Sequence, residues 1–177
     1  MLTTDRLIIR PFRKSDGADL YEYLSREETY RYEPGKPITR DIAGKIAADR
    51  AGGTNFWAVT LKEGGHKLIG HVSFIRIEPK QFRTWEIGFI FHPDFQNKGY
   101  ATEASRAIIE HAFQELDTHR VVGYSAVDNT ASWRILEKCG MRREGLQRQN
   151  AYFHEDKDGR PRWLDSYQYA ILAEDKR

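Results

Sequence analysis

The segment FQNKGYATEA, residues 95–104, joins a strand-like run to a helix-like run. Before it, RTWEIGFIFH (residues 83–92) places alternate side chains on two faces, as a β-strand does. After it, apolar residues over 101–116 recur at i, i+3, i+4 and i+7, which predicts a helix. Such a junction leaves backbone N–H groups unpaired at the positive end of the helix dipole. The segment is therefore predicted to bind a phosphate group.

The loop itself does not match the common phosphate-binding motifs. It lacks the Gly-Lys-Ser/Thr ending of a P-loop and the three spaced glycines of a dinucleotide-binding turn. What remains is the pattern Q-x-x-G-x-A, formed by Gln96, Gly99 and Ala101. Gly99 lets a ligand approach the backbone closely, and Ala101 keeps the first helical turn slim. Taken alone, residues 96–101 also fit an ordinary glycine-containing turn.

Outward from this unit, the chain divides into short strands and helices without repeats or long linkers. Strands are predicted at residues 6–12, 56–61, 67–77, 83–92 and 120–127. Helices are predicted from Ser15 or Asp16, from Thr39 to the glycines at 52 and 53, over residues 101–116, and from Asp128 or Asn129 to Lys138. Residues 141–172 are predicted to form a long hairpin. The order β-α-α-β-β-β-α-β-α-β-β indicates an α/β or α+β domain in which a strand–helix–strand unit supplies a parallel pair.

The composition limits the class of protein. The chain has 177 residues, which suits a single domain over 1–177, and a net charge of +2, too balanced for a dedicated nucleic-acid binder. Neither a membrane-spanning run nor a signal-peptide layout is visible. The single cysteine and the absence of histidine pairs at ligand spacing predict no metal site. We therefore expect a cytoplasmic protein.

Three stretches resemble one known family. EIGFIFHPDFQNKGYATEA (86–104) resembles the acyl-CoA signature of the GNAT superfamily of N-acyltransferases, and VDNTASWRILEKCGM (127–141) resembles its second signature. LTTDRLIIRPFRKSD (2–16) is similar to the opening of the Rim-type branch, which acetylates ribosomal-protein N-termini and has antibiotic- and polyamine-modifying relatives. The resemblance implies one GNAT-like N-acetyltransferase domain. Its sheet would be mixed and mostly antiparallel, flanked by helices, with the parallel pair at the acyl-CoA site.

The resemblance also implies how acetyl-CoA is bound. The backbone amides that would cradle its pyrophosphate belong to Gln96, Asn97, Lys98, Gly99, Tyr100 and Ala101. Ile90 and Phe91 would lend main-chain groups to the pantetheine arm and the thioester carbonyl. Asn129 would contact the cofactor arm, and it also fits the N-cap of the following helix through different atoms.

Acetyl transfer needs a neutral amine, yet an α-amine has a pKa of roughly 7.7–8.0 and a lysine one of about 10.4. Glu86 is predicted to accept the proton, since the matching position of this branch is often acidic; the alternative is a solvated strand residue. Leu136 stands where many members carry a tyrosine that serves the leaving thiolate. Ser132 is the substitute that the Rim-type branch suggests, and it also fits an ordinary first-turn serine.

These inferences predict an enzyme that moves an acetyl group from acetyl-CoA to a primary amine by direct attack. The first acceptor considered is the N-terminal α-amine of a ribosomal or other protein. The alternatives are a small amine (a polyamine, an aminoglycoside or another antibiotic) and a non-catalytic acyl-CoA-binding module. No membrane and no direct nucleic-acid partner is expected. The β-rich tail suits pairing across a homodimer.

Overall fold

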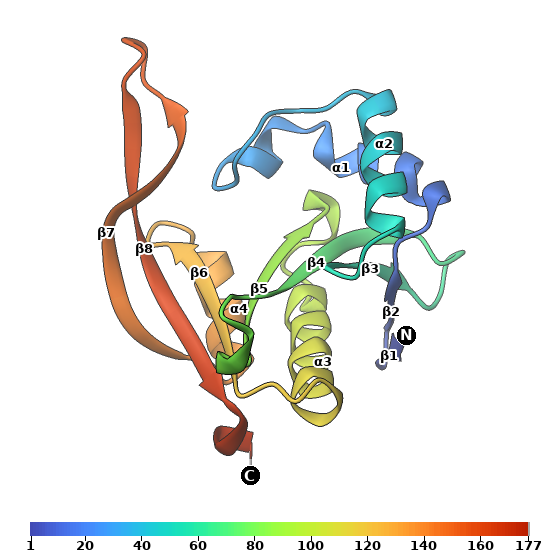
Figure 1. Ribbon diagram of the computed structural model, residues 1–177. Coiled ribbons are helices and arrows are strands. Elements are labelled where there is room, and N and C mark those ends of the chain that lie inside the picture. The colour runs from blue at the N-terminus through green and yellow to red at the C-terminus, as the bar shows by residue number, and fades with distance from the viewer. Residues whose placement is uncertain (177) are drawn as a thin grey trace.

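The computed structural model describes residues 1–176 and, within them, one eight-stranded sheet in the order β1-β2-β3-β4-β5-β6-β8-β7 (Figure 1). The strands are β1 Leu2–Thr3, β2 Leu7–Pro11, β3 Phe56–Leu61, β4 Leu68–Arg76, β5 Thr84–Phe91, β6 Arg120–Ala126, β7 Arg142–Glu155 and β8 Pro161–Leu172. The α-helices are α1 Gly17–Leu24, α2 Arg40–Ala51, α3 Tyr100–Glu115 and α4 Thr130–Lys138. Short 3-10 turns are η1 Lys14–Asp16, η2 Glu27–Tyr30, η3 Lys80–Phe82, η4 Pro93–Phe95 and η5 Ala173–Lys176. The predicted mixed α/β domain is confirmed.

The parallel pair is β5 with β6, as the strand–helix–strand order predicts. Its register joins Thr84 to Arg120 and Glu86 to Val122, and pairing ends there. Both strands continue beyond that point, β5 to Phe91 and β6 to Ala126. The two strands therefore separate, and their far ends leave a gap in the sheet. Every other neighbouring pair that the structure describes is antiparallel.

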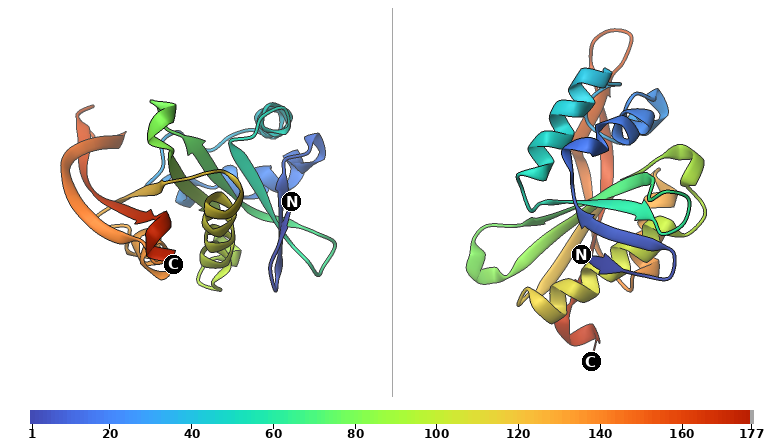
Figure 2. Two further views of the ribbon diagram at one scale, coloured as in Figure 1. Left: turned by 60° about the horizontal axis from the view of Figure 1, so that its bottom comes forward. Right: turned by 90° about the vertical axis from the view of Figure 1, so that its right-hand side faces the viewer.

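The helices cover the two faces of the sheet: α3 and α4 lie against one face, and α1 and α2 against the other (Figures 1 and 2). Alternate side chains of β5 serve the two layers. Ile87 and Phe91 are buried in the core with Ile108 of α3. Ile90 packs instead against the cluster built around Leu20 of α1. The two faces of β5 therefore contact different groups of apolar side chains next to the gap.

The helix signals of the sequence are confirmed at three ends. Thr39 caps α2, its hydroxyl accepting from Ile42 N at 3.4 Å. Asn129 caps α4, its side-chain oxygen accepting from Ser132 N at 3.2 Å. Gly140 follows α4 with φ 85°, a left-handed conformation that glycine adopts without strain.

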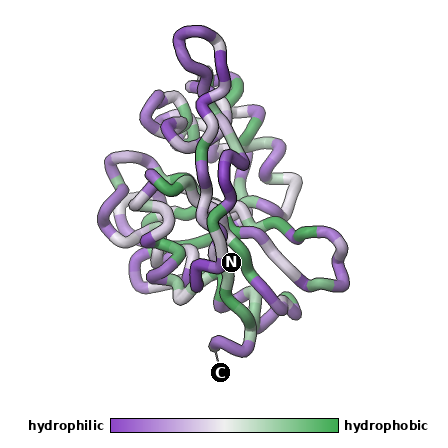
Figure 3. The backbone as a smooth tube through the Cα atoms, turned by 90° about the vertical axis from the view of Figure 1, so that its left-hand side faces the viewer, coloured by the Kyte–Doolittle hydropathy of each residue, from purple (hydrophilic) through white to green (hydrophobic). Residues whose placement is uncertain are grey.

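The tail forms the predicted hairpin, but its place in the sheet was not predictable. β8, the second arm, pairs with β6, and β7 forms the sheet edge. The far end of this hairpin is a hydrophilic loop (Figure 3). The two-residue strand β1 was also missed, because it is too short for periodicity to reveal. Within the described chain, no helix is long and apolar enough to cross a membrane.

Candidate active site

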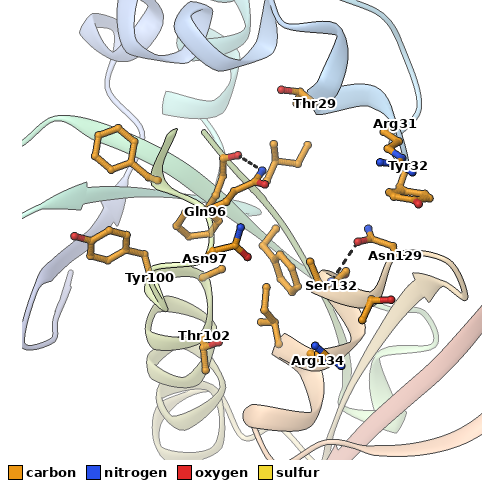
Figure 4. A pocket seen from close by; sticks show the side chains of 18 of the residues that line it. Thr29, Arg31, Tyr32, Gln96, Asn97, Tyr100, Thr102, Asn129, Ser132 and Arg134 are labelled. Carbon is orange, nitrogen blue, oxygen red and sulfur yellow. Dashed lines mark hydrogen bonds between the residues drawn. The ribbon is translucent and has the colours of Figure 1, made fainter. Parts of the chain in front are cut away.

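A cavity of about 710 Å³ lies between the start of α3, the start of α4 and the segment that links α1 to α2. We call it the helix-terminus cavity. Figure 4 shows Thr29, Arg31 and Tyr32 on the linking segment, with Gln96 at the α3 side and Asn129 on the α4 side. The three segments are far apart in sequence. The gap between β5 and β6 brings them together.

The loop before α3 presents free backbone donors to this cavity. Gly99, with φ 83°, is the N-cap of α3 and provides no side-chain cap. The first helical hydrogen bond runs from Glu103 N to Gly99 O at 3.0 Å. The N–H groups of Tyr100, Ala101 and Thr102 precede that bond, and all three residues line the cavity. This helix terminus suits an anion.

Arg6 holds the loop from outside the cavity. Its guanidinium donates to Lys98 O at 3.0 Å and to the Glu103 carboxylate at 2.7 Å. The guanidinium carbon also lies 4.4 Å from the centre of the Tyr100 ring. The loop conformation is therefore fixed from outside the cavity by Arg6.

Two side chains of the predicted loop are held by backbone carbonyl groups. The Gln96 amide donates to Phe91 O at 3.0 Å, which ties the loop to the end of β5 (Figure 4). The Lys98 amine donates to Asp94 O at 2.9 Å, and Lys98 is absent from the cavity lining. Only the backbone of Lys98 can serve a ligand in this arrangement.

The main-chain expectation for Ile90 is corrected by the sheet register. His92 N donates to Ile69 O at 2.9 Å, and Ile90 pairs with His71 without a register shift. Even-numbered residues of β5 therefore direct their N–H and C=O groups to β4, and odd-numbered ones direct theirs to the gap. Phe89 and Phe91 direct their N–H groups to the gap, Phe91 O being already bonded to the Gln96 amide, while Ile90 reaches the cavity with its side chain. Sequence periodicity assigns faces but not hydrogen-bond direction, so Phe89 was missed.

A second cavity of about 730 Å³ lies on the face of the sheet covered by α1 and α2. We call it the sheet-face cavity. Glu86 lines it, as do the aromatic side chains Tyr30 and Phe56. Partial burial raises the pKa of the Glu86 carboxyl above its usual value. Glu86 does not line the helix-terminus cavity.

The two cavities meet at six residues that line both of them: Tyr32, Glu33, Phe89, Ile90, Asn129 and Ser132. The predicted Asn129 and Ser132 thus stand at the junction. In the described part of the chain, the Ser132 hydroxyl has no hydrogen-bond partner. Leu136 is buried and packs toward Gly123 and Ile87, so no polar group replaces the family tyrosine there.

The linking segment contributes Tyr32 and one residue that the sequence did not single out, Glu33. Tyr32 donates to Asp128 O at 3.2 Å across the junction. Glu33 is half-buried beside it, and burial raises the pKa of its carboxyl to about 7. Nothing in the run EPGKP signals this role, because the contacts span about a hundred positions. Arg134 and Lys138, which line the helix-terminus cavity, stand four apart on α4, a helical spacing that would have indicated a shared face.

Among residues 1–176, no group of three or more His, Cys, Asp or Glu side chains could hold a metal ion. The arrangement is instead one of backbone donors, cationic side chains at a helix-lined cavity, and carboxylates in the adjoining one. The first cavity offers backbone donors and cationic side chains to an extended anion, and the second offers two carboxylates, which stand beside Lys36 and Arg50. The junction would bring molecules bound in the two cavities together.

Comparisons with known proteins agree with this geometry. Residues 6–142 match the family model described as acetyltransferase (GNAT) domain. The chain is 36% identical over 174 residues to the uncharacterized N-acetyltransferase YnaD of Bacillus subtilis, covering 98% of each. It is 34% identical over 148 residues to the ribosomal-protein-serine acetyltransferase of Escherichia coli, covering 78% of this chain and 80% of that one. A GNAT-family acetyltransferase structure from Bacillus anthracis superposes with a TM-score of 0.84 at 35% identity, covering 98% of both chains.

Proposed function

Because the chain belongs to the GNAT family and is an acetyl-CoA-dependent N-acetyltransferase, we propose that its acceptor is the N-terminal α-amine of a protein, a ribosomal protein first. The observation that carries the proposal is the junction, where a cavity with backbone anion donors meets one lined by carboxylates. The similarity to a ribosomal-protein-serine acetyltransferase supports the choice of acceptor.

The chain's own residues fit acetyl-CoA, which supplies the activated acetyl group. The N–H groups at the start of α3 would hold its pyrophosphate, and the side chains of Arg134 and Lys138 suit its remaining phosphate. The gap-facing N–H groups of Phe89 and Phe91 would orient the pantetheine arm and polarise the thioester carbonyl. Asn129, held by its capping bond, lines the path between α4 and the linking segment.

Glu86 is proposed to help remove the proton of the acceptor amine, and its replacement tests that role. We expect Glu86→Gln to lower turnover at neutral pH by about 10- to 100-fold, the value of one hydrogen bond to a charged group. Acetyl-CoA affinity should be kept, because Glu86 lies outside the helix-terminus cavity. Steady-state kinetics across pH and a binding titration measure both, with the exposed Glu63→Gln as control. Unchanged turnover at every pH would remove Glu86 from this role.

Ser132 is proposed to assist the departing thiol. We expect Ser132→Ala to slow turnover at pH 7 by about 2- to 10-fold, the value of one uncharged hydrogen bond. The loss should appear in kcat, because the hydroxyl is needed only as the thiolate departs, and acetyl-CoA affinity should be kept. Steady-state kinetics and a binding titration of the two proteins decide the point. An unchanged kcat would remove Ser132 from this role.

Free-thiol release from acetyl-CoA with a panel of amines tests the proposed acceptor. The panel holds N-terminal peptides of ribosomal proteins, polyamines and aminoglycosides, with a no-acceptor control. We expect release with the peptides, and an N-terminally blocked copy of the best peptide should be silent. Release with polyamines or aminoglycosides alone would establish the second candidate, a small amine, which the carboxylates of the sheet-face cavity also suit through charge.

A further inference from the structure

We propose that Glu33, in the segment between η2 and α2, takes the proton directly from the acceptor amine at the junction of the two cavities. This residue lies outside both family motifs and outside the strands and helices. The inference rests on the proposed transfer to a primary amine, and it adds a second carboxylate to the reaction.

Position singles out Glu33. Of the six residues that line both cavities, it is the one that carries a carboxylate. Glu86 borders the sheet-face cavity alone, and it stands four residues before Ile90 on β5. Four residues of a strand span about 13 Å. Glu86 therefore reaches the junction across water or contacts the far part of the acceptor, whereas Glu33 borders the point of transfer.

The backbone around Glu33 is fixed although it forms no regular element there. Glu33 N donates to Tyr30 O at 3.4 Å, and the same carbonyl is bonded to His154 Nε2 at 2.7 Å. The Tyr32 hydroxyl donates to Asp128 O at 3.2 Å. The segment is thus held by the β7–β8 hairpin on one side and by the start of α4 on the other. These contacts fix the backbone from which the carboxylate extends to the junction.

The acid–base state of Glu33 suits the task. Among the described residues it has no ion-pair or hydrogen-bond partner for its carboxylate, and burial raises its pKa to about 7. A base is most effective when its pKa lies near the working pH, and an α-amine has a pKa of roughly 7.7–8.0. The proton therefore moves between groups of nearly matched affinity.

The step balances as follows. An ammonium N–H bond breaks and its proton goes to the Glu33 carboxylate. The lone pair of the neutral amine forms the bond to the acetyl carbon while the carbon–sulfur bond breaks. The second amine proton goes to the departing thiolate, and Glu33 returns its own proton to water. No oxidant, reductant or further reactant is needed.

Other titratable groups line the two cavities, and their effects must be distinguished from that of Glu33. Arg31 and Lys36 lie on its own segment, Arg50 on α2, Tyr124 on β6, and Arg134 and Lys138 on α4; Glu28 lies on η2. His71 of β4 stays neutral near pH 7, because burial lowers its pKa well below the usual value. Glu86 is then the neighbour with a raised carboxyl pKa, so its variant belongs in the experiment.

The test compares Glu33→Gln, Glu33→Asp and Glu86→Gln in the full chain, with whichever amine the panel identifies. We expect Glu33→Gln to lower kcat by about 100-fold or more, as loss of a general base does, and to abolish the rise of kcat through pH 7. Glu33→Asp should restore part of the rate, and Glu86→Gln should keep the rise. Glu27→Gln, a neighbour that lines neither cavity, is the control. Wild-type kcat and pH profile in Glu33→Gln would overturn the proposal.

A second readout needs no substrate. Because the pKa of Glu33 is raised in the folded state, the folded protein holds this proton more tightly than the unfolded chain, and stability falls as pH rises from about 4.5 to about 7. Glu33→Gln should therefore melt higher than wild type at pH 8, with a much smaller gain at pH 5. An equal difference at both pH values would contradict the assigned carboxyl. If the wild-type protein releases no thiol from acetyl-CoA with any amine, the proposed function is overturned. The melting data would still test the raised pKa of Glu33.

Discussion

Gly99→Val is expected to weaken acetyl-CoA binding by about 10²- to 10⁴-fold, which corresponds to losing two charge-assisted hydrogen bonds of about 1.5–3 kcal/mol each. Gly99 has φ 83°, a conformation that β-branched residues very rarely adopt. The nearest atom to a Cβ built there is Arg6 Nη2, at 3.3 Å. The substitution is therefore expected to change the backbone conformation of the loop and to displace the loop from Arg6. The N–H groups at the start of α3 then lose their common direction.

Isothermal titration with acetyl-CoA measures the loss, and circular dichroism shows whether the variant is folded. Gly65→Val is the matched control, since Gly65 also has φ 83° but nothing lies within 4 Å of its added Cβ. It reports the general cost of valine at this backbone angle, at a site far from the cavity. A folded Gly99→Val protein that binds acetyl-CoA as well as wild type would remove the loop from the binding site.

Local signals explain why the strand and helices that frame the helix-terminus cavity were predictable. The expected strand over residues 83–92 is β5 Thr84–Phe91, and the helix expected to begin at Asp128 or Asn129 is α4 Thr130–Lys138 with Asn129 as its N-cap. Strand alternation, a positive-φ glycine and a capping asparagine each act over a few residues. A helical crossover between neighbouring strands then favours parallel pairing.

The acceptor side depends on contacts that no short pattern contains. Glu33 reaches the junction because its segment is bonded to the start of α4 and to the β7–β8 hairpin, at separations of 96 and 124 residues. The free main-chain groups of Phe89 follow from the register with β4, which periodicity leaves open. The motifs therefore predict which molecule binds at the start of α3, whereas the residues at the junction are brought together by long-range packing.

Asp16 is another residue whose main contact the sequence did not reveal. We expect its replacement to lower stability more than the other substitutions do. The sequence predicts Ser15 or Asp16 as a helix cap, and Asp16 does occupy the N-cap of α1 without a side-chain capping bond there. Its carboxylate instead accepts from Arg10 Nη2 at 2.7 Å and Nη1 at 2.9 Å. The side chains are only 9% and 7% exposed. The pair joins β2 to the start of α1.

We expect Asp16→Asn to lower the free energy of unfolding by about 3–5 kcal/mol, because the Arg10 charge is left buried without a counter-charge. For a chain of this size that lowers the melting temperature by roughly 6–20 °C. Asp117→Asn is the matched control: its partner Arg83 is also at 2.7 Å, but the side chains are 47% and 82% exposed. Its loss should stay below about 1 kcal/mol.

Replacing both partners separates the charge from the packing. Arg10→Met combined with Asp16→Leu removes the buried charges together, so it should recover much of the stability that Asp16→Asn loses. Equal losses in Asp16→Asn and Asp117→Asn, measured by thermal and urea unfolding, would mean that the Arg10 pair is as well solvated as a surface pair. If the losses differ as expected, the part of the fold that joins β2 to α1 depends strongly on this ion pair. Substitutions inside the sheet-face cavity should then be compared only in proteins that keep the pair intact.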